Sequence, residues 1–257
     1  MTIVQTSTAL YTIASKEIGR FLRIWTQTLL PSVITMVMYL IIFGTFIGNR
    51  IHVVEHIDYI QFIIPGLIMM SVITNAYTNV VSSFYLGKFT RHIEELLVSP
   101  TPNYVILIGY TIGGVLRGLV VGILISIISL LFTKISLYNI PLTILFILLT
   151  SILFSLAGFL NSLFAKSFDD ISLIPTFILT PLSYLGGVFY SIDLLPKFWQ
   201  VVSRCNPILY MVNGFRYGFL GTSDVSVMAG LYILISCIAI LFITNLILLR
   251  RGFGIKT

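Results

Sequence analysis

Two histidines and a glutamate stand at a spacing that can bind zinc, in the sequence His52-Val-Val-Glu-His56. The pattern His-x-x-Glu-His occurs in one class of zinc proteases. Zinc chemistry would need both histidines on one helical face, a third protein ligand and an open position for water. The motif falls in a short connection between apolar runs, where Asp193 or Asp224 would have to complete the ligand set. A match this short is weak evidence, so we predict a polar loop and no metal site.

The remaining polar residues do not combine into a catalytic site. Glu94 and Glu95 are adjacent, so they point in different directions on a helix and cannot act as a paired acid and base. The sequence has no Gly-x-x-x-x-Gly-Lys-[Ser/Thr] phosphate loop. We therefore predict no catalytic residue and no cofactor bound by this chain.

Arg117 is a cation within a long apolar run, where a charge costs about 2.5–3.5 kcal/mol to insert and is normally functional or paired. Gly114, Gly118 and Gly122 repeat every fourth residue around it, and such a ridge permits close helix contact. We predict that these four residues line a transport pathway or a contact between two copies of the chain. The alternative is structural: Arg117 donates hydrogen bonds to carbonyls of a broken neighbouring helix.

The composition shows that these residues belong to a membrane protein. Of 257 residues, 57% are hydrophobic and only 9% are charged, and the mean hydropathy is +1.03. A soluble domain carries about 25% charged residues, so a cytosolic enzyme, a disordered chain and a secreted disulfide-bonded domain are excluded. A span needs about 20 apolar residues. The sequence predicts an all-α integral membrane protein, a single domain over 1–257, with six spans near 29–48, 60–83, 104–131, 141–164, 171–189 and 227–249.

The 15 lysines and arginines predict the orientation of these spans. With the N-terminus inside, the inner side carries Lys16, Arg20, Arg23, Lys88, Arg91, Lys166, Arg250, Arg251 and Lys256. The outer side carries fewer: Arg50, Lys134, Lys197, Arg204 and Arg216. This bias places both termini in the cytoplasm. The net charge of +6 fits anionic lipid headgroups, and no basic segment supports nucleic-acid binding.

The N-terminal segment 1–28 is predicted to form an amphipathic helix on the inner leaflet. Its apolar face would carry Leu10, Ala14, Phe21 and Trp25, and its polar face Lys16, Arg20 and Arg23. The alternative is a frayed polar tail.

The cytoplasmic segment 86–102 alternates charged and apolar residues at helical spacing, and Pro100 and Pro102 end it. Such a helix can lie on the membrane or place its apolar side in a groove of a soluble partner. The pattern alone favours the membrane surface.

The outer segment 190–226 is long and semi-apolar, and the span before it is interrupted by Pro175, Pro181, Gly186 and Gly187. Prolines in a span mark cavities or re-entrant pieces. We predict two short helices that dip into the outer leaflet; an ordinary extracellular loop is the alternative.

Three stretches in chain order resemble the permease subunits of type-2 ATP-binding-cassette (ABC) exporters. They are Ile93-Glu-Glu-Leu-Leu-Val-Ser-Pro100, Pro181-Leu-Ser-Tyr-Leu-Gly-Gly-Val-Phe-Tyr190 with Leu195-Pro196 following, and Asn206-Pro207 through Gly214-Phe-Arg-Tyr217. The resemblance implies a homodimer in the bacterial inner membrane that exports an amphipathic or lipid-linked substrate. Two soluble ATPase subunits, which bind ATP and Mg, would supply the energy.

The resemblance also assigns roles to residues. The helix after the second span would be the coupling helix, which reverses the preference for the membrane surface, with ATPase contacts from Arg91, Glu94, Glu95, Leu96, Leu97 and Pro100. The outer gate would involve Pro181, Gly186, Gly187, Pro207, Tyr210 and Arg216. An ion-coupled secondary transporter is the alternative function, but it usually has acidic residues within its spans and internal repeats. We find no carboxylate in a predicted span and no convincing repeat.

Overall fold

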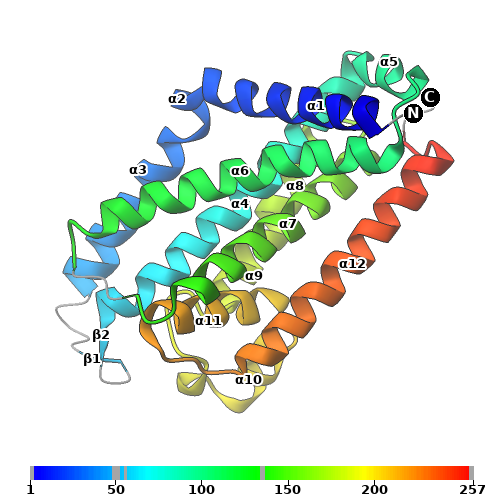
Figure 1. Ribbon diagram of the computed structural model, residues 1–257. Helices are drawn as coiled ribbons and strands as arrows, with labels where there is room; N and C mark the ends of the chain where they lie inside the picture. The colour runs from blue at the N-terminus through cyan, green and yellow to red at the C-terminus, as the bar shows by residue number, and fades with distance from the viewer. Residues whose placement is uncertain (1–2, 48–52, 55–56, 134–136, 255–257) are drawn as a thin grey trace.

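The computed structural model describes residues 3–47, 53–54, 57–133 and 137–254. Within these ranges the chain is helical apart from a short antiparallel pair of strands (Figure 1). In chain order the elements are α1 (Ile3–Arg23), α2 (Trp25–Thr28), α3 (Leu30–Tyr39), the π-helix η1 (Leu40–Ile47), β1 (Val53–Val54), β2 (Ile57–Asp58), α4 (Tyr59–Phe89), α5 (His92–Val98), α6 (Asn103–Ser129), α7 (Ile140–Phe164), α8 (Phe168–Ile174), the π-helix η2 (Pro175–Leu179), α9 (Thr180–Leu185), the 3₁₀ helix η3 (Ile192–Leu194), α10 (Lys197–Arg204), α11 (Pro207–Leu220) and α12 (Val227–Arg251).

Five helical stretches in the described part of the chain are long and apolar enough to cross a membrane: Trp25–Gly44, Tyr59–Phe89, Asn103–Ser129, Ile140–Phe164 and Val227–Arg251. They coincide with five of the six predicted spans. The remaining prediction, 171–189, falls on the broken run α8, η2 and α9, in which Pro175 begins η2 and Pro181 lies in the first turn of α9. This run is shorter and less regular than the others because proline interrupts the helical hydrogen bonding.

Local sequence explains where several helices begin and end. Asn139 caps α7 by accepting a hydrogen bond from the Leu142 N–H at 3.1 Å. Ser167 and Asp170 form a reciprocal capping box at the start of α8. Gly221 and Gly252 end α11 and α12 with the positive φ angles that glycine adopts at low cost. These caps pair backbone groups that would otherwise be left without partners at the ends of these helices.

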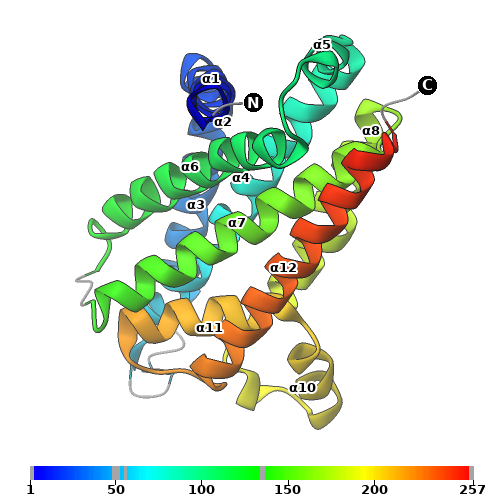
Figure 2. The same ribbon diagram turned by 45° about the vertical axis from the view of Figure 1, so that its right-hand side comes forward.

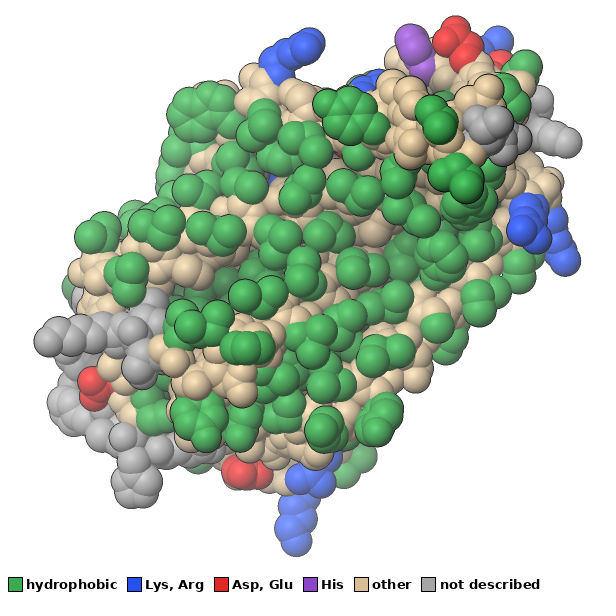
Figure 3. Space-filling model, in the orientation of Figure 1, with side chains coloured by type: hydrophobic (Ala, Val, Ile, Leu, Met, Phe, Trp, Pro, Cys, Tyr) green, Lys and Arg blue, Asp and Glu red, His purple; other side chains and the backbone are tan. Residues whose placement is uncertain are grey.

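The helices are arranged between two ends of the molecule (Figures 1 and 2). Both termini, α1 and α5 lie at one end, which the charge distribution assigns to the cytoplasm, and α10 and α11 lie at the other. The face drawn in Figure 3 is covered by hydrophobic side chains, with charged side chains toward its two ends. This distribution is that of a membrane-embedded surface.

Helix α4 is the centre of the fold, since 83% of its most apolar stretch is buried within the chain. It packs against α6 on one side and α7 on the other, and α11 closes its outer end. Side chains such as Phe62, Ile68 and Val72 are fully buried in the larger apolar cluster. A second cluster, which includes Phe84, Tyr110 and Phe159, lies toward the cytoplasmic end beside α1 and α5.

Helix α1 confirms a helix in the N-terminal segment, but its faces differ from the prediction. Phe21 and Ala14 are buried, as expected of an apolar face, whereas Trp25 is exposed. The chain breaks at Ile24 and starts a separate helix, so Trp25 is out of register with α1. Of the predicted polar face, Lys16 is exposed, whereas Arg20 is half-buried and hydrogen-bonded to Asn79 of α4.

Candidate functional site

Four polar residues of α4 lie on one buried face at a spacing of one helical turn: Ser71, Asn75, Asn79 and Ser83. We call this row and its bonded partners the polar seam. The partners come from other elements and are Glu17, Arg20, Ser32 and Arg117. Buried polar groups are costly unless they are hydrogen-bonded, so the seam fixes how α1, α3 and α6 sit against α4.

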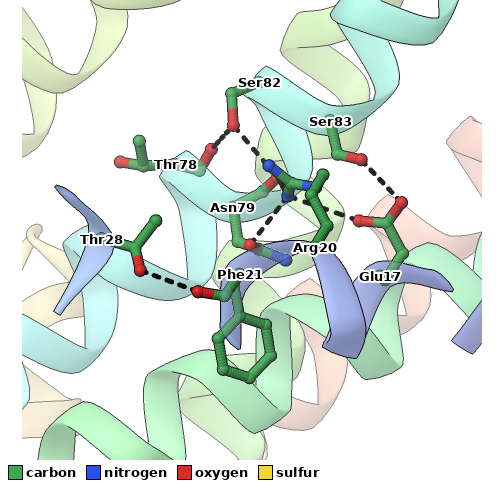
Figure 4. Close-up of polar contacts among 8 residues, drawn as sticks. All are labelled: Glu17, Arg20, Phe21, Thr28, Thr78, Asn79, Ser82 and Ser83. Carbon is green, nitrogen blue, oxygen red and sulfur yellow. Dashed lines mark hydrogen bonds and ion pairs between the residues drawn. The ribbon is translucent and has the colours of Figure 1, made fainter. Parts of the chain in front are cut away.

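The cytoplasmic half of the seam joins α1 to α4 (Figure 4). Glu17 is only 1% exposed, and its carboxylate accepts a hydrogen bond from Ser83 Oγ at 2.6 Å. Arg20 lies between Glu17 and Asn79, with its Nη2 3.4 Å from Glu17 Oε2. The same nitrogen donates to Asn79 O and Oδ1, each at 2.9 Å. A carboxylate, a guanidinium and an amide thus lock the interfacial helix onto the central helix.

The middle of the seam holds Arg117, which is 7% exposed. Its Nη2 donates to the backbone carbonyl of Thr28 at 3.0 Å and to Asn75 Oδ1 at 3.0 Å. Thr28 ends α2, where the chain breaks before α3. Asn75 in turn donates to Ser32 Oγ at 2.9 Å. These contacts have the geometry of the structural alternative for Arg117; a role in the transport pathway stays a prediction.

The glycine ridge of α6 faces other helices of the same chain. A Cβ on Gly114 would lie 2.6 Å from Val80 Cγ2 and 2.9 Å from the Ala76 carbonyl oxygen, both on α4. Gly118 approaches Ala76 as well, and Gly122 approaches Ile147 of α7. The close helix contact predicted for the ridge is therefore made with α4 and α7. A contact between two copies through these glycines stays a prediction, and their intrachain packing gives it no support.

The predicted ATPase-contact residues lie on and beside α5. Arg91 precedes the helix with φ 61°, an uncommon conformation for a residue with a side chain, and the chain reverses sharply there from α4. Ile93 is buried and anchors α5 to α4 and α6. Arg91, Glu94, Glu95 and Pro100 are exposed, whereas Leu96 and Leu97 are half-buried against this chain. Val98, which the sequence analysis did not select, is 88% exposed.

Three of the predicted outer-gate residues, Gly186, Gly187 and Arg216, lie near the junction of α9 and α11. Arg216 is 1% exposed, donates to the Gly187 carbonyl at 2.5 Å, and stacks on the Phe62 ring at 3.9 Å from its centre. Gly187 has φ 72° in the turn after α9, and Gly186 packs against the start of α11. The other three, Pro181, Pro207 and Tyr210, have separate positions: Pro181 is exposed on α9, Pro207 begins α11, and Tyr210 donates to the Arg204 carbonyl at 2.9 Å.

A polar hollow of about 320 Å³ opens between α3, α4 and α9. The hydroxyl-bearing side chains that line it are Ser32, Thr35, Tyr39, Ser71, Thr74, Thr180 and Tyr184. The Tyr39 and Tyr184 hydroxyls are 3.2 Å apart across its rim. Ser71 is 2% exposed, and its Oγ has no hydrogen-bond partner among the described residues. A hollow lined by hydroxyl groups can make polar contacts with a ligand or another chain.

His52, Glu55 and His56 of the predicted zinc motif lie outside the described residues. Among the residues that the structure describes, no group of three or more His, Cys, Asp and Glu is placed to hold a metal ion.

Comparison with known proteins now bears on these features. A family described as ABC-2 type transporter matches residues 8–220. The chain belongs to the ABC-2 type transporter family. The inner membrane transport permease YadH of Escherichia coli (strain K12) is 57% identical over 249 residues, which cover 97% of each chain. Nodulation protein J of Rhizobium leguminosarum bv. viciae is 24% identical over 236 residues, 88% of this chain and 90% of the relative.

Membership of the ABC-2 family settles the class of this chain. It is an inner-membrane transport permease with several membrane-spanning helices, and it is a transmembrane subunit without an ATPase domain of its own. The resemblance drawn from the stretches around Ile93–Pro100 and Pro181–Tyr190 is confirmed. Helix α5, the polar seam and the polar hollow are therefore features of a transport subunit.

Most of the polar seam was not predicted from the sequence, because the seam within α4 consists of neutral side chains and contains no carboxylate. The signal was present as the four-residue spacing of Ser71, Asn75, Asn79 and Ser83 inside an apolar run. Glu17 and Arg20 were also visible as a pair three residues apart, which face the same side of a helix.

Proposed function

We propose that two copies of this ABC-2 permease form an export pathway that two separate ATPase subunits drive. The proposal includes six membrane crossings per chain, with α8, η2 and α9 as the fifth. This run leads from the end that holds α5 toward the end that holds α11, which supports a crossing (Figures 1 and 2). Family membership favours ATP-driven transport over the ion-coupled alternative.

The observation that carries the proposal is the form of α5. This helix is held rigidly by Ile93 and by the α4 turn at Arg91, yet it exposes Glu94, Glu95 and Val98. An apolar side chain flanked by two carboxylates on an anchored helix fits a groove of a soluble protein, because the charges fix its register. ATP-driven approach of the ATPases would push α5 and, through α4, rock the spans.

The polar hollow supports a pathway between two copies. Beside it α4 carries a second polar row, Thr74, Thr78 and Ser82, which we call the hydroxyl stripe. Each of these hydroxyls donates to the carbonyl four residues earlier, at 2.9, 2.6 and 2.6 Å. The lone pairs of these hydroxyl oxygens remain free to accept hydrogen bonds from a substrate. The lining has hydroxyls and aromatic rings but no charged side chain, which supports an uncharged or amphipathic substrate.

The outer helices would complete the exit side. The hydrogen bond from Arg216 to the Gly187 carbonyl connects α11 to the turn after α9. A movement of the broken run α8–η2–α9 would therefore displace α11 as well. We propose that α10 and α11 dip into the outer leaflet and form part of the outer gate. The amphipathic character of α10, with Phe198 and Trp199 exposed, supports contact with lipid.

Co-purification tests the ATPase contact. The full chain is expressed together with a soluble ATP-binding-cassette ATPase, and the ATPase retained on the permease is measured. Val98→Glu and Glu95→Lys are expected to lose the ATPase, and Lys197→Glu at the outer end is the matched control. Transport by the purified permease alone in vesicles, without nucleotide, would contradict the proposal.

Cysteine cross-linking in membranes tests the dimer. Cys205 and Cys237 are first replaced by Ser, and Thr35→Cys or Thr74→Cys is added at the polar hollow. A dimer over this hollow gives cross-linked pairs at these positions and none for Ile123→Cys on the outward side of α6. Cross-linking confined to the α6 control would refute this arrangement.

A further inference from the structure

Two neighbouring hollows on α1, α6, α7 and α12 are not used by any part of the proposed function. The upper hollow, of about 440 Å³, lies between α1 and the start of α6. The lower hollow, of about 410 Å³, lies between α6, α7 and α12. Ile108 lines both, so the two hollows adjoin at this residue, and we call the pair the groove. Figure 2 shows α7 running between α6 and α12 on the side toward the viewer.

The chemistry of the groove changes along its length. The upper hollow has the hydroxyls of Thr6, Ser7 and Tyr104 beside aliphatic side chains. The lower hollow is aliphatic except for Phe242 and Thr111, and the Thr111 hydroxyl is turned onto its own helix, where it donates to the Leu107 carbonyl at 2.7 Å. The groove thus runs from a mixed polar end at the cytoplasmic boundary to an apolar end inside the membrane.

The length of the apolar part matches one leaflet. From Ile108 to Leu119 the groove follows α6 for a rise of about 16 Å, at 1.5 Å per residue. Half of a hydrocarbon core of about 30 Å is about 15 Å. An acyl chain that hangs from the inner headgroup region would therefore fill the lower hollow to its end.

The walls of the groove favour a lipid over another helix. Helices that pack in membranes use small residues to bring their backbones together. The side chains along the α6 wall are instead large and half-buried: Ile108, Ile112, Val115, Leu116 and Leu119. A flexible acyl chain can follow such a surface, whereas a second helix would be kept away from it.

We propose that this groove binds a phospholipid of the inner leaflet, with one acyl chain between α6, α7 and α12 and the ester and headgroup region beside Thr6, Ser7 and Tyr104. The lipid bridges α1 to the spans at the end where α1 is seated closely on α6, as the contact of Gly109 with Ile13 shows. It is a bound component of the permease and differs from the freely exchanging lipid around it.

Photolabelling tests the site. The full chain is placed in phosphatidylethanolamine vesicles in which a fraction of the lipid carries a diazirine near the end of one acyl chain. After illumination, labelled peptides are mapped by mass spectrometry. We expect label on the facing sides of α6, α7 and α12 around Val115, Ile152 and Ile238.

Two variants narrow the groove from opposite walls, Ile112→Trp on α6 and Leu148→Trp on α7. Each is expected to lose the groove label, so the proposal stays testable if one variant fails to fold. Ile123→Trp and Ile144→Trp are matched controls on the same two helices, at exposed positions outside the groove, and should keep it.

Three results would overturn the proposal. Label spread evenly over the exposed faces of α6 and α12, and unchanged in the tryptophan variants, would mean bulk lipid only. Cross-links between two chains through Val115→Cys would mean that a second copy covers the groove. Displacement of the groove label by a transported compound would mean that the groove belongs to the substrate route.

Discussion

Replacing Glu17 tests the polar seam directly, because this carboxylate is almost fully buried and joins two helices. Glu17→Ala removes the acceptor of Ser83 Oγ and the anion beside Arg20. A hydrogen bond to a charged group contributes about 1.5–3 kcal/mol. The ion pair adds at most about 1 kcal/mol, because Arg20 is partly exposed and keeps its bonds to Asn79. We expect a loss of about 3 kcal/mol in the free energy of unfolding.

For a chain of this size, that loss corresponds to a fall in Tm of about 6–12 °C. The assay is thermal unfolding of the purified full chain in detergent, followed by size-exclusion chromatography of the surviving folded fraction. Glu17→Gln keeps an acceptor for Ser83 and should lose only about 1 kcal/mol. Lys16→Ala, at an exposed position on the same helix, should change stability by less than about 0.5 kcal/mol.

A double-mutant cycle separates the contact from general damage. Glu17→Ala combined with Ser83→Ala should cost about 1–2 kcal/mol less than the sum of the single variants, because the second change removes a bond already lost. The reasoning is refuted if Glu17→Ala is no worse than Lys16→Ala, or if the two changes are additive.

Three further predictions concern other parts of the chain. Gly114→Ala should destabilise the permease by about 1–3 kcal/mol in the same thermal assay, because its Cβ meets a backbone carbonyl of α4, whereas Gly19→Ala on α1 has open space and should be neutral or stabilising. Hydrogen bonds from the backbone N–H groups of Lys166 and Ser167 lower the pKa of Asp170 below 3.8, so its contribution to stability is present above that pH and is lost as the pH falls through the lowered value. Asp170→Asn should therefore flatten the acid side of a profile of Tm against pH. Arg216→Ala should cost about 2–3 kcal/mol through the lost bond to the Gly187 carbonyl and the lost stacking on Phe62, measured as thermal stability at neutral pH.

The apolar runs were sufficient to predict five spans. Within lipid the backbone N–H and C=O groups must be hydrogen-bonded inside the protein, and in a long apolar run a helix satisfies them. They were less informative where proline intervenes. The run that contains Pro175 and Pro181 has the apolarity of a span, yet it folds as three short helical pieces. Composition alone does not determine how a chain satisfies the carbonyls that proline leaves free, since the partners come from elsewhere in the fold.

The candidate site was predictable only in part, and the glycine ridge shows why. The spacing of Gly114, Gly118 and Gly122 correctly indicated a close helix contact, but periodicity carries no information about which helix makes it. The hydrogen-bond partner of Arg117 could not be predicted for the same reason, because the carbonyl that it binds belongs to Thr28, which is far away in sequence. The glycine ridge and Arg117 each indicate the kind of contact that is needed, a close helix or a hydrogen-bond acceptor. Only the fold determines which helix or which carbonyl makes that contact.

The two polar rows of α4 connect the proposed ATPase contact at α5 with the proposed transport pathway at the polar hollow, because both rows lie on one helix. Asn79 and Ser83 bind α1, which lies beside α5, while Thr74 of the hydroxyl stripe lines the hollow. Because α4 is a continuous helix from Tyr59 to Phe89, a force on α5 that tilts its end must also move the hydroxyls at its middle. Breaking the bonds of Glu17 should therefore leave ATP hydrolysis by the partner intact while lowering the transport obtained from each ATP. Equal losses of hydrolysis and transport in Glu17→Ala would show instead that α1 acts on ATPase binding.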